Sequence, residues 1–221
     1  MDDLSSTRRT WHALAEHLLA GDLQRRTGRI GLRVTPGGFG QPEITGDAGR
    51  RRIRIDGPHV VFLDGDVERW HTPATAAEAA HLVGADLGAP TGTYETQTTL
   101  DPTAELRIEP AAASALSTWF GLVARSLEAV RHRCADAAPS IVQLWPEHFD
   151  VACTISEVNL GGSPGDDAHP EPYLYVGPWS PRTGPFWNEP WGASLGWEHV
   201  TDEDAAIRFL LDGLREADAL G

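Results

Sequence analysis

The stretch from Leu144 to Trp179 reads LWPEHFDVACTISEVNLGGSPGDDAHPEPYLYVGPW and gathers two histidines, six carboxylates, two tyrosines and two tryptophans. Between Cys134 and Pro181 the chain holds seven carboxylates and no arginine. Such local negative charge favours a bound cation, although exposed carboxylates also simply face water. We therefore expect the fold to be organised around this stretch and look for the functional site within it.

Two strands are predicted in this stretch. Over residues 149–155, apolar side chains alternate with small or polar ones, as in a strand that buries one face. The alternation places His148 and Asp150 together on the opposite face. Tyr173 and Tyr175 share one face of the second strand, whose start is confined to a sheet edge by neighbouring prolines.

The segment between these strands, NLGGSPGDDAHPEP at residues 159–172, predicts a loop because it is rich in Gly, Pro and Asp. If the two strands pair, the loop folds over the end of the sheet. It then brings His169 and Glu171 toward His148 and Asp150. The sequence thus predicts one site at which histidines and carboxylates converge.

One interpretation of this site is metal binding. Neutral imidazoles and carboxylates together suit a borderline or hard divalent ion, which makes a divalent metal the candidate cofactor. The predicted metal ligands are His148, Asp166, His169 and Glu171. Their spacing matches no established signature such as HExxH, so nothing in the spacing identifies a metal.

A second interpretation is nucleophilic catalysis, because residues 161–165 read GGSPG and fit the G-x-S-x-G pattern. The oxyanion hole of that motif uses the backbone N–H of the residue after the serine. Pro164 occupies this position and has no N–H. We therefore reject a nucleophile elbow and expect a turn.

A third interpretation is recognition of a small polar or cationic ligand. Aromatic rings attract cations, and carboxylates orient them. The predicted ligand contacts are Asp166, Glu171, Tyr173, Tyr175, Trp179 and Trp187, with Trp191 completing the aromatic lining. In the competing interpretation, the aromatic side chains complete the core and the carboxylates are solvated.

The sequence leaves open whether the protein is an enzyme. Proton transfer is the most available chemistry, because imidazole titrates near neutrality and an adjacent carboxylate orients it. The catalytic candidates are His148, Asp150 and His169. The alternative function is a non-catalytic interaction module that uses the tryptophan-rich residues 179–197 as a partner-binding surface.

The N-terminal part predicts a helix over residues 6–20, which Gly21 ends in a left-handed conformation. An antiparallel meander follows, with strand patterns at residues 29–34, 52–55, 59–63 and 67–71. The Asp64-Gly65 pair predicts a tight hairpin turn between the last two strands.

Thr75 and Glu78 form a capping box that opens a short helix, and Gly84 is expected to end it. Residues 84–109 have no sustained period and predict irregular chain with one short strand near residues 105–108.

The longest helix is predicted from Pro110 to about Ala135, since apolar residues recur there at spacings of three and four. A last helix is expected after Thr201, which would act as its N-cap.

The whole chain, residues 1–221, therefore predicts a single α+β domain. It would contain a largely antiparallel sheet with the long central helix packed on one face and flanking terminal helices. Two related halves meeting near residues 84–109 are the alternative.

Composition argues against several partners. The 221 residues carry a formal net charge of −14, which opposes binding to nucleic acid or to an anionic membrane. All 18 cationic side chains are arginine, so no lysine can form a Schiff base.

We find no apolar run long enough to span a bilayer and no signal-peptide pattern, and expect a soluble, cytoplasmic protein. Cys134 and Cys153 lack CxxC spacing and are expected to be free thiols.

The chain resembles an uncharacterised, mostly actinobacterial family that carries a domain of unknown function, on the segments TGRIGLRVTPGGFGQP, LWPEHFDVA, SPGDDAHPEPYLYVGPW and GPFWN. The resemblance extends from about Thr10 to Leu214 and is most specific from Leu144 to Trp179. It implies the order of helices and strands given above. It implies no activity and no catalytic residues.

Overall fold

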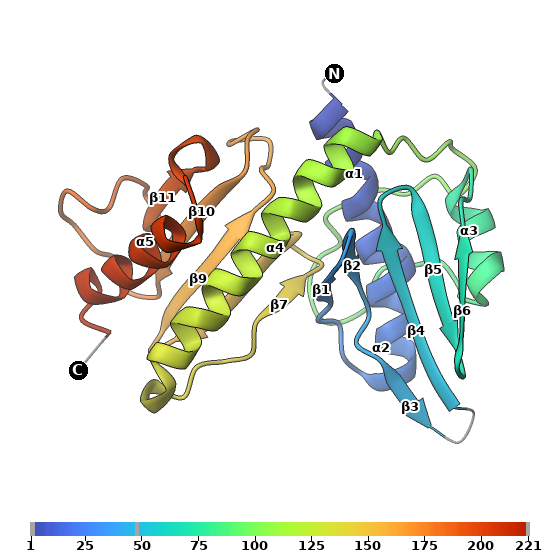
Figure 1. Cartoon of the computed structure of the whole chain (residues 1–221), viewed down its shortest axis with the longest axis horizontal. Coiled ribbons are helices and arrows are strands. Elements are labelled where there is room, and N and C mark those ends of the chain that lie inside the picture. The colour runs from blue at the N-terminus through green and yellow to red at the C-terminus, as the bar shows by residue number, and fades with distance from the viewer. Residues whose placement is uncertain (1–2, 47–48, 220–221) are drawn as a thin grey trace. The chain divides into compact units, whose positions relative to one another are not determined.

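The computed structural model describes residues 3–46 and 49–219. Its strands form antiparallel sheets, and its helices include the 24-residue α4 (Pro110–Arg133). The predicted α+β class, with antiparallel strands and a long helix, is therefore confirmed. The strands lie in two sheets, where we had expected one (Figure 1).

The chain divides into two compact units, which are described separately. The first unit extends to Thr118 and also contains Leu144–Phe149. The second unit contains Trp119–Gln143 and the chain from Asp150 onward. The chain passes from the first unit to the second within α4, and not within the irregular residues 84–109.

The sheet of the first unit has the strand order β1-β2-β4-β5-β6, and β3 also pairs with β4. The strands are β1 (Arg33–Thr35), β2 (Gly38–Gly40), β3 (Ile44–Gly46), β4 (Gly49–Asp56), β5 (His59–Asp64) and β6 (Val67–His71). The predicted meander is confirmed for β4, β5 and β6. The earliest strand pattern is shorter than predicted, and Leu32 before β1 forms an isolated bridge with Leu144 of β7 (Gln143–Trp145).

The N-terminal helix is longer than predicted. Its successive segments are α1 (Asp3–Leu14), a π-helical segment (Ala15–Ala20) and α2 (Gly21–Thr27). The prediction that Gly21 ends the helix is wrong, because this residue is helical with φ −63°. Gly28, with φ 73°, ends it instead. Glycine is needed at position 21 because the backbone of Gly88 lies close to the helix there. A Cβ on Gly21 would overlap the carbonyl oxygen of Gly88.

The π-helical segment presents a buried carboxylate, Glu16, to the irregular chain. Its Oε1 accepts a hydrogen bond from the Gln97 N–H at 3.1 Å, and its Oε2 accepts one from the Thr98 N–H at 2.8 Å. The bonds fasten residues 97–98 to the helix. Residues 84–109 are otherwise irregular, as expected, and the predicted short strand is reduced to a bridge between Glu105 and Thr75.

The capping box at α3 (Ala76–Val83) is confirmed. Thr75 Oγ1 accepts a hydrogen bond from the Glu78 N–H at 3.2 Å. The Glu78 carboxylate accepts one in turn from the Ala74 N–H at 2.7 Å. Gly84, with φ 59°, ends the helix in the left-handed conformation that favours glycine.

The sheet of the second unit contains the strand order β11-β10-β9-β8. Its strands are β8 (Asp150–Ile155), β9 (Val158–Ser163), β10 (Tyr173–Pro178) and β11 (Ala193–Gly196). The prediction of a loop over residues 159–172 is therefore wrong in its first part. Residues 158–163 form β9, which lies between the two predicted strands and pairs with both.

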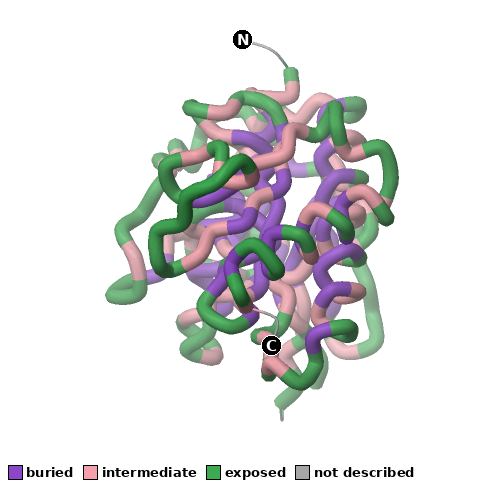
Figure 2. The backbone as a smooth tube through the Cα atoms, turned by 90° about the vertical axis from the view of Figure 1, so that its left-hand side faces the viewer, coloured by how far each residue is buried: buried purple, intermediate pink, exposed green. Residues whose placement is uncertain are grey.

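Two glycines let helices approach the apolar face of this sheet. A Cβ on Gly162 of β9 would overlap Val123 of α4. A Cβ on Gly213 of α5 (Glu203–Glu216) would overlap Val176 of β10. The buried apolar residues of this sheet include Val151, Cys153, Ile155, Leu160, Leu174 and Val176. The connection between β10 and β11 is largely exposed (Figure 2).

The N-cap of α5 is Asp202, and not Thr201 as predicted. Its side chain accepts a hydrogen bond from the Ala205 N–H at 2.7 Å. Cys134 and Cys153 are buried free thiols, and burial raises the pKa of Cys153 to about 12. Among the described residues, none of the helices has the length and hydrophobicity that spanning a lipid bilayer requires.

Candidate functional site

The face of the β8–β11 sheet opposite its apolar face carries Tyr173 and Tyr175 of β10. Tyr175 stands directly opposite Gly161 of β9. Its ring lies against the backbone of this glycine, because a Cβ on Gly161 would overlap the ring. The glycine thus allows the tyrosine side chain to cross β9 and reach β8.

The Tyr175 hydroxyl donates a hydrogen bond to Asp150 Oδ2 at the start of β8. Asp150 is buried, with 5% of the residue exposed. Burial, together with the negative charge of Asp150, raises the pKa of Tyr175 well above its usual value. The phenol therefore stays protonated and acts as the donor to the carboxylate.

A second tyrosine–carboxylate pair lies two residues earlier on β10. The Tyr173 hydroxyl donates to Asp166 Oδ2 at 2.8 Å. Burial and the bond to Asp166 raise the pKa of Tyr173, against a smaller opposing effect of the Ser163 hydroxyl. Ser163 is buried, and its Oγ accepts from the Gly165 N–H at 3.1 Å. The GGSPG segment is thus the end of β9 and a turn, with its serine hydroxyl occupied.

Asp166 also organises the loop that follows β9. Its Oδ1 accepts hydrogen bonds from the N–H groups of Ala168 and His169, both at 2.7 Å. Burial opposes ionisation of this carboxyl group, but the backbone bonds and the Tyr173 hydroxyl outweigh it and lower the pKa of Asp166. Asp166 is therefore a fixed anion at neutral pH.

The imidazole of His169 is held by a carboxylate from the tryptophan-rich segment. His169 Nε2 lies 3.1 Å from Glu189 Oε1, which also accepts a hydrogen bond from Ser194 Oγ at 2.8 Å. The His169 ring is tilted against Tyr173, with 5.1 Å between centroids. Trp191 adds a further ring, 6.4 Å from that of Tyr173.

An open hollow with a volume of about 550 Å³ lies beside this network. Two carboxylates, Glu171 and Glu198, and two aromatic rings, Tyr173 and Trp197, contribute to its lining together with His169. No arginine belongs to the lining. The hollow therefore combines negative charge with aromatic surface on one side of the second unit.

The structure brings together part of the predicted ligand-binding set. Asp166, His169 and Tyr173 are joined by the contacts above, and Glu171 shares the hollow with His169 and Tyr173. Trp179 is 64% exposed, and its Nε1 donates to Asn159 Oδ1 at 3.1 Å. Neither Trp179 nor Trp187, whose ring packs on Phe186 with centroids 5.0 Å apart, is among the residues that line the hollow.

His148 does not share a strand face with Asp150, so that prediction is wrong. The strand β8 begins only at Asp150. Phe149, immediately before it, has φ 53°, a left-handed conformation that changes the direction of the chain. His148 belongs to the first unit, where its side chain is 71% exposed and its Nε2 lies 3.7 Å from Glu147.

The residues described here contain no group of three or more His, Cys, Asp or Glu side chains placed to hold a metal ion. Of the four predicted ligands, His148 lies in the first unit and the other three in the second. Binding of a metal by His148, Asp166, His169 and Glu171 stays a prediction to which this geometry adds no support.

Sequence reasoning missed Glu189, Ser194 and Glu198. Each lies in or beside the segment that was singled out only for its tryptophans. The signal that could have found the two glutamates is their position beside the tryptophans, Glu189 before Trp191 and Glu198 after Trp197; Ser194 has no such signal.

No family model, no curated protein and no solved structure matches the chain.

Proposed function

We propose that the second unit binds a small organic cation, such as an amine or a quaternary ammonium compound, in the hollow beside β10 and β11. The observation that carries the proposal is the lining itself, which joins Glu171 and Glu198 to the rings of Tyr173 and Trp197 without any arginine. Carboxylates attract a cation, and the face of an aromatic ring contributes about 0.5–2 kcal/mol to holding it.

The size and the supporting contacts of the hollow agree with this proposal. Its volume of about 550 Å³ lies within the range of small-molecule sites. Tyr173 is held by Asp166, and His169 is held by Glu189, so two of the lining side chains are already oriented. Preorganised side chains lose less conformational entropy when a ligand binds.

Calorimetric titration with choline tests the proposal, with its neutral isostere 3,3-dimethyl-1-butanol as the matched probe. We expect choline to bind and the isostere to bind at least about 10-fold more weakly, a factor that corresponds to about 1.4 kcal/mol. Glu171→Gln and Trp197→Ala should each weaken choline binding, whereas Glu216→Gln on the exposed part of α5 should not. Equal binding of both probes, or no binding of either, would refute the proposal.

A second candidate function is a partner-binding surface formed by the tryptophan-rich segment. The observation that favours it is that three tryptophans of this segment, Trp179, Trp191 and Trp197, are all exposed, since large exposed apolar side chains that gather on a surface mark interaction sites. Capture experiments with the immobilised protein and its Trp179→Ser variant test this function. A partner retained by the protein and lost by the variant is the expected result, and equal retention would count against it.

A further inference from the structure

The outer edge of β6 exposes backbone hydrogen-bonding groups in a pattern that the register defines. Asp64 and Val67 pair across a two-residue loop, so these residues exchange both of their hydrogen bonds. Bonded pairs recur at every second residue, which turns the N–H and C=O groups of Arg69 toward β5. The N–H and C=O groups of Glu68 and Trp70 therefore point away from the sheet.

The pairing of β4 with β5 independently supports this assignment of the groups that point inward and outward. The Gly65 N–H donates to the carbonyl oxygen of Arg50 at 2.8 Å, across β5 and β4. Gly65 therefore faces β4, and Asp64, one residue earlier, faces β6. The outward direction of the four groups on β6 thus follows from two separate hairpins.

No other strand pairs with β6 on its outer side among the described residues. No hydrogen bond from the described chain satisfies the outward groups of Glu68 and Trp70. Within the described part of the first unit, the exposed large apolar side chains are Val67 and Trp70, at 52% and 51%, and both belong to this strand. The edge is therefore open and partly apolar.

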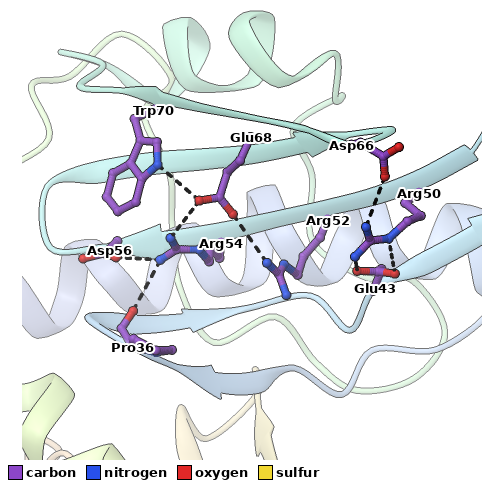
Figure 3. A network of polar contacts seen from close by, with 9 residues as sticks. All are labelled: Pro36, Glu43, Arg50, Arg52, Arg54, Asp56, Asp66, Glu68 and Trp70. Atoms are coloured by element: carbon purple, nitrogen blue, oxygen red, sulfur yellow. Dashed lines mark hydrogen bonds and ion pairs between the residues drawn. The ribbon is translucent and has the colours of Figure 1, made fainter.

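The side chains of β6 are held in place by a polar network (Figure 3). Glu68 accepts hydrogen bonds from Arg52 at 3.5 Å and from Arg54 at 3.4 Å. The guanidinium of Arg54 lies 4.8 Å from the centre of the Trp70 ring, and Trp70 Nε1 donates to Glu68 at 3.2 Å. A strand fixed in this way is preorganised to accept a neighbour.

The charges on β6 are balanced within the first unit. Glu68 is paired with two arginines, and Arg69 lies 3.2 Å from Asp64. Covering this edge therefore buries no unpaired charge, which would otherwise oppose association.

We propose that β6 is a self-association edge, on which β6 of a second copy of this chain pairs in the antiparallel direction about a two-fold axis. Glu68 of one copy would then face Trp70 of the other, and all four outward groups of each strand would be bonded. A register that places Trp70 opposite Trp70, or Glu68 opposite Glu68, uses only two of these four groups within β6. A second copy is chosen over an unrelated strand because its β6 carries the same four unbonded groups, so that one contact completes the open edges of both chains.

The two-fold arrangement places Arg69 of one copy opposite Arg69 of the other. Like charges directly opposite each other weaken a strand pair, although each arginine keeps its own Asp64. The net charge of −14 on each chain adds a longer-range repulsion. The dimer is therefore weak, and its proportion increases with salt concentration, because salt screens both repulsions.

Disulfide cross-linking of the full chain tests the register. Opposed residues of a non-bonded antiparallel pair have Cα atoms about 4.5 Å apart, within the range that a disulfide spans. An Arg69→Cys variant, oxidised with glutathione disulfide, should thus form a covalent dimer. Val67→Cys is the matched control, because Val67 would face His71 and lie about 14 Å from its own counterpart, too far for a disulfide. The natural cysteines are buried and contribute little background.

Sedimentation of the unmodified protein over a range of concentration and salt completes the test. We expect the fraction of dimer to increase with protein concentration and with salt concentration. Trp70→Pro should reduce this fraction more than Trp70→Ala, because only proline also removes the outward N–H. Circular dichroism establishes that both variants are folded. A monomer at all concentrations, or a dimer in which Arg69→Cys cross-links no better than Val67→Cys, would overturn the proposal.

Discussion

The outer edges of the end strands β6 and β11 differ in whether a side chain bonds their outward backbone groups. On β11, the Ser194 N–H donates to Asn188 Oδ1 at 2.9 Å, and Asn188 Nδ2 donates to the Ser194 carbonyl at 3.1 Å. One side-chain amide thus occupies the place of a neighbouring strand. On β6, no described residue does the same for Glu68 or Trp70. Asn188 therefore blocks the edge of β11 at Ser194. The lack of such a side chain on β6, among the described residues, leaves that edge open to a partner strand.

The polar faces of the two sheets differ as well. On the first sheet, arginines from β4 cross to carboxylates and to Trp70, in contacts that depend on charge (Figure 3). On the second sheet, tyrosine side chains lie over glycine and reach carboxylates, in contacts that depend on close fit. We therefore expect the first face to tolerate changes of shape and the second to tolerate almost none.

The largest effect is expected from Gly161→Ala in the second sheet. The new Cβ would overlap the ring of Tyr175, which the bond to Asp150 holds in place. We expect a loss of about 2–3 kcal/mol in the free energy of unfolding, measured by urea denaturation. Gly121→Ala on α4 is the control, because its Cβ would meet only the flexible end of Arg125. Equal stability of the two variants would contradict the close fit.

A smaller effect is expected from Arg54→Met in the first sheet. The substitution keeps the length of a side chain that is largely buried but removes its bonds to Asp56 and Glu68. We expect a loss of about 2 kcal/mol in the free energy of unfolding, since hydrogen bonds to charged groups contribute about 1.5–3 kcal/mol.

The matched control for Arg54→Met is Arg52→Met. Arg52 is more exposed than Arg54, and its contact with Glu68 is long, at 3.5 Å, so its loss should change stability by less than about 1 kcal/mol. Thermal unfolding of both variants at low and high salt measures the difference. Indistinguishable variants would mean that the network does not stabilise this face.

The smallest effect on stability is expected from Asn188→Ala, which would make β11 resemble β6. The exposed site allows water to replace the amide, so we expect a loss of about 0.5–1 kcal/mol. The opened edge should also increase self-association, measured by sedimentation. Asn188→Asp is the control, because it keeps an acceptor for the Ser194 N–H and removes the donor to the Ser194 carbonyl. If neither variant changed association, the blocking role of Asn188 would be wrong.

Elements whose signals are local could be predicted from the sequence. The hairpin turn between β5 and β6 was predicted at the right place, because Gly at a tight turn is a local signal, although the two loop residues are Gly65 and Asp66 and Asp64 is the last residue of β5. Thr75 and Gly84 fixed the ends of α3, because capping requires only side chains and backbone within one turn. The shared face of Tyr173 and Tyr175 followed from the two-residue period of a strand.

The role of the glycines and the composition of the site depend on contacts between residues far apart in the sequence. Gly21 indicated a helix end and Gly161 indicated a loop, yet the first lies inside a helix and the second inside β9. Both are needed because a distant group, the carbonyl of Gly88 or the ring of Tyr175, occupies the space of a Cβ. Glu189 likewise reaches His169 from 20 residues away. A local sequence pattern indicates which backbone conformations a residue can adopt. The atoms that come close to that residue from distant parts of the chain are determined only when the chain packs.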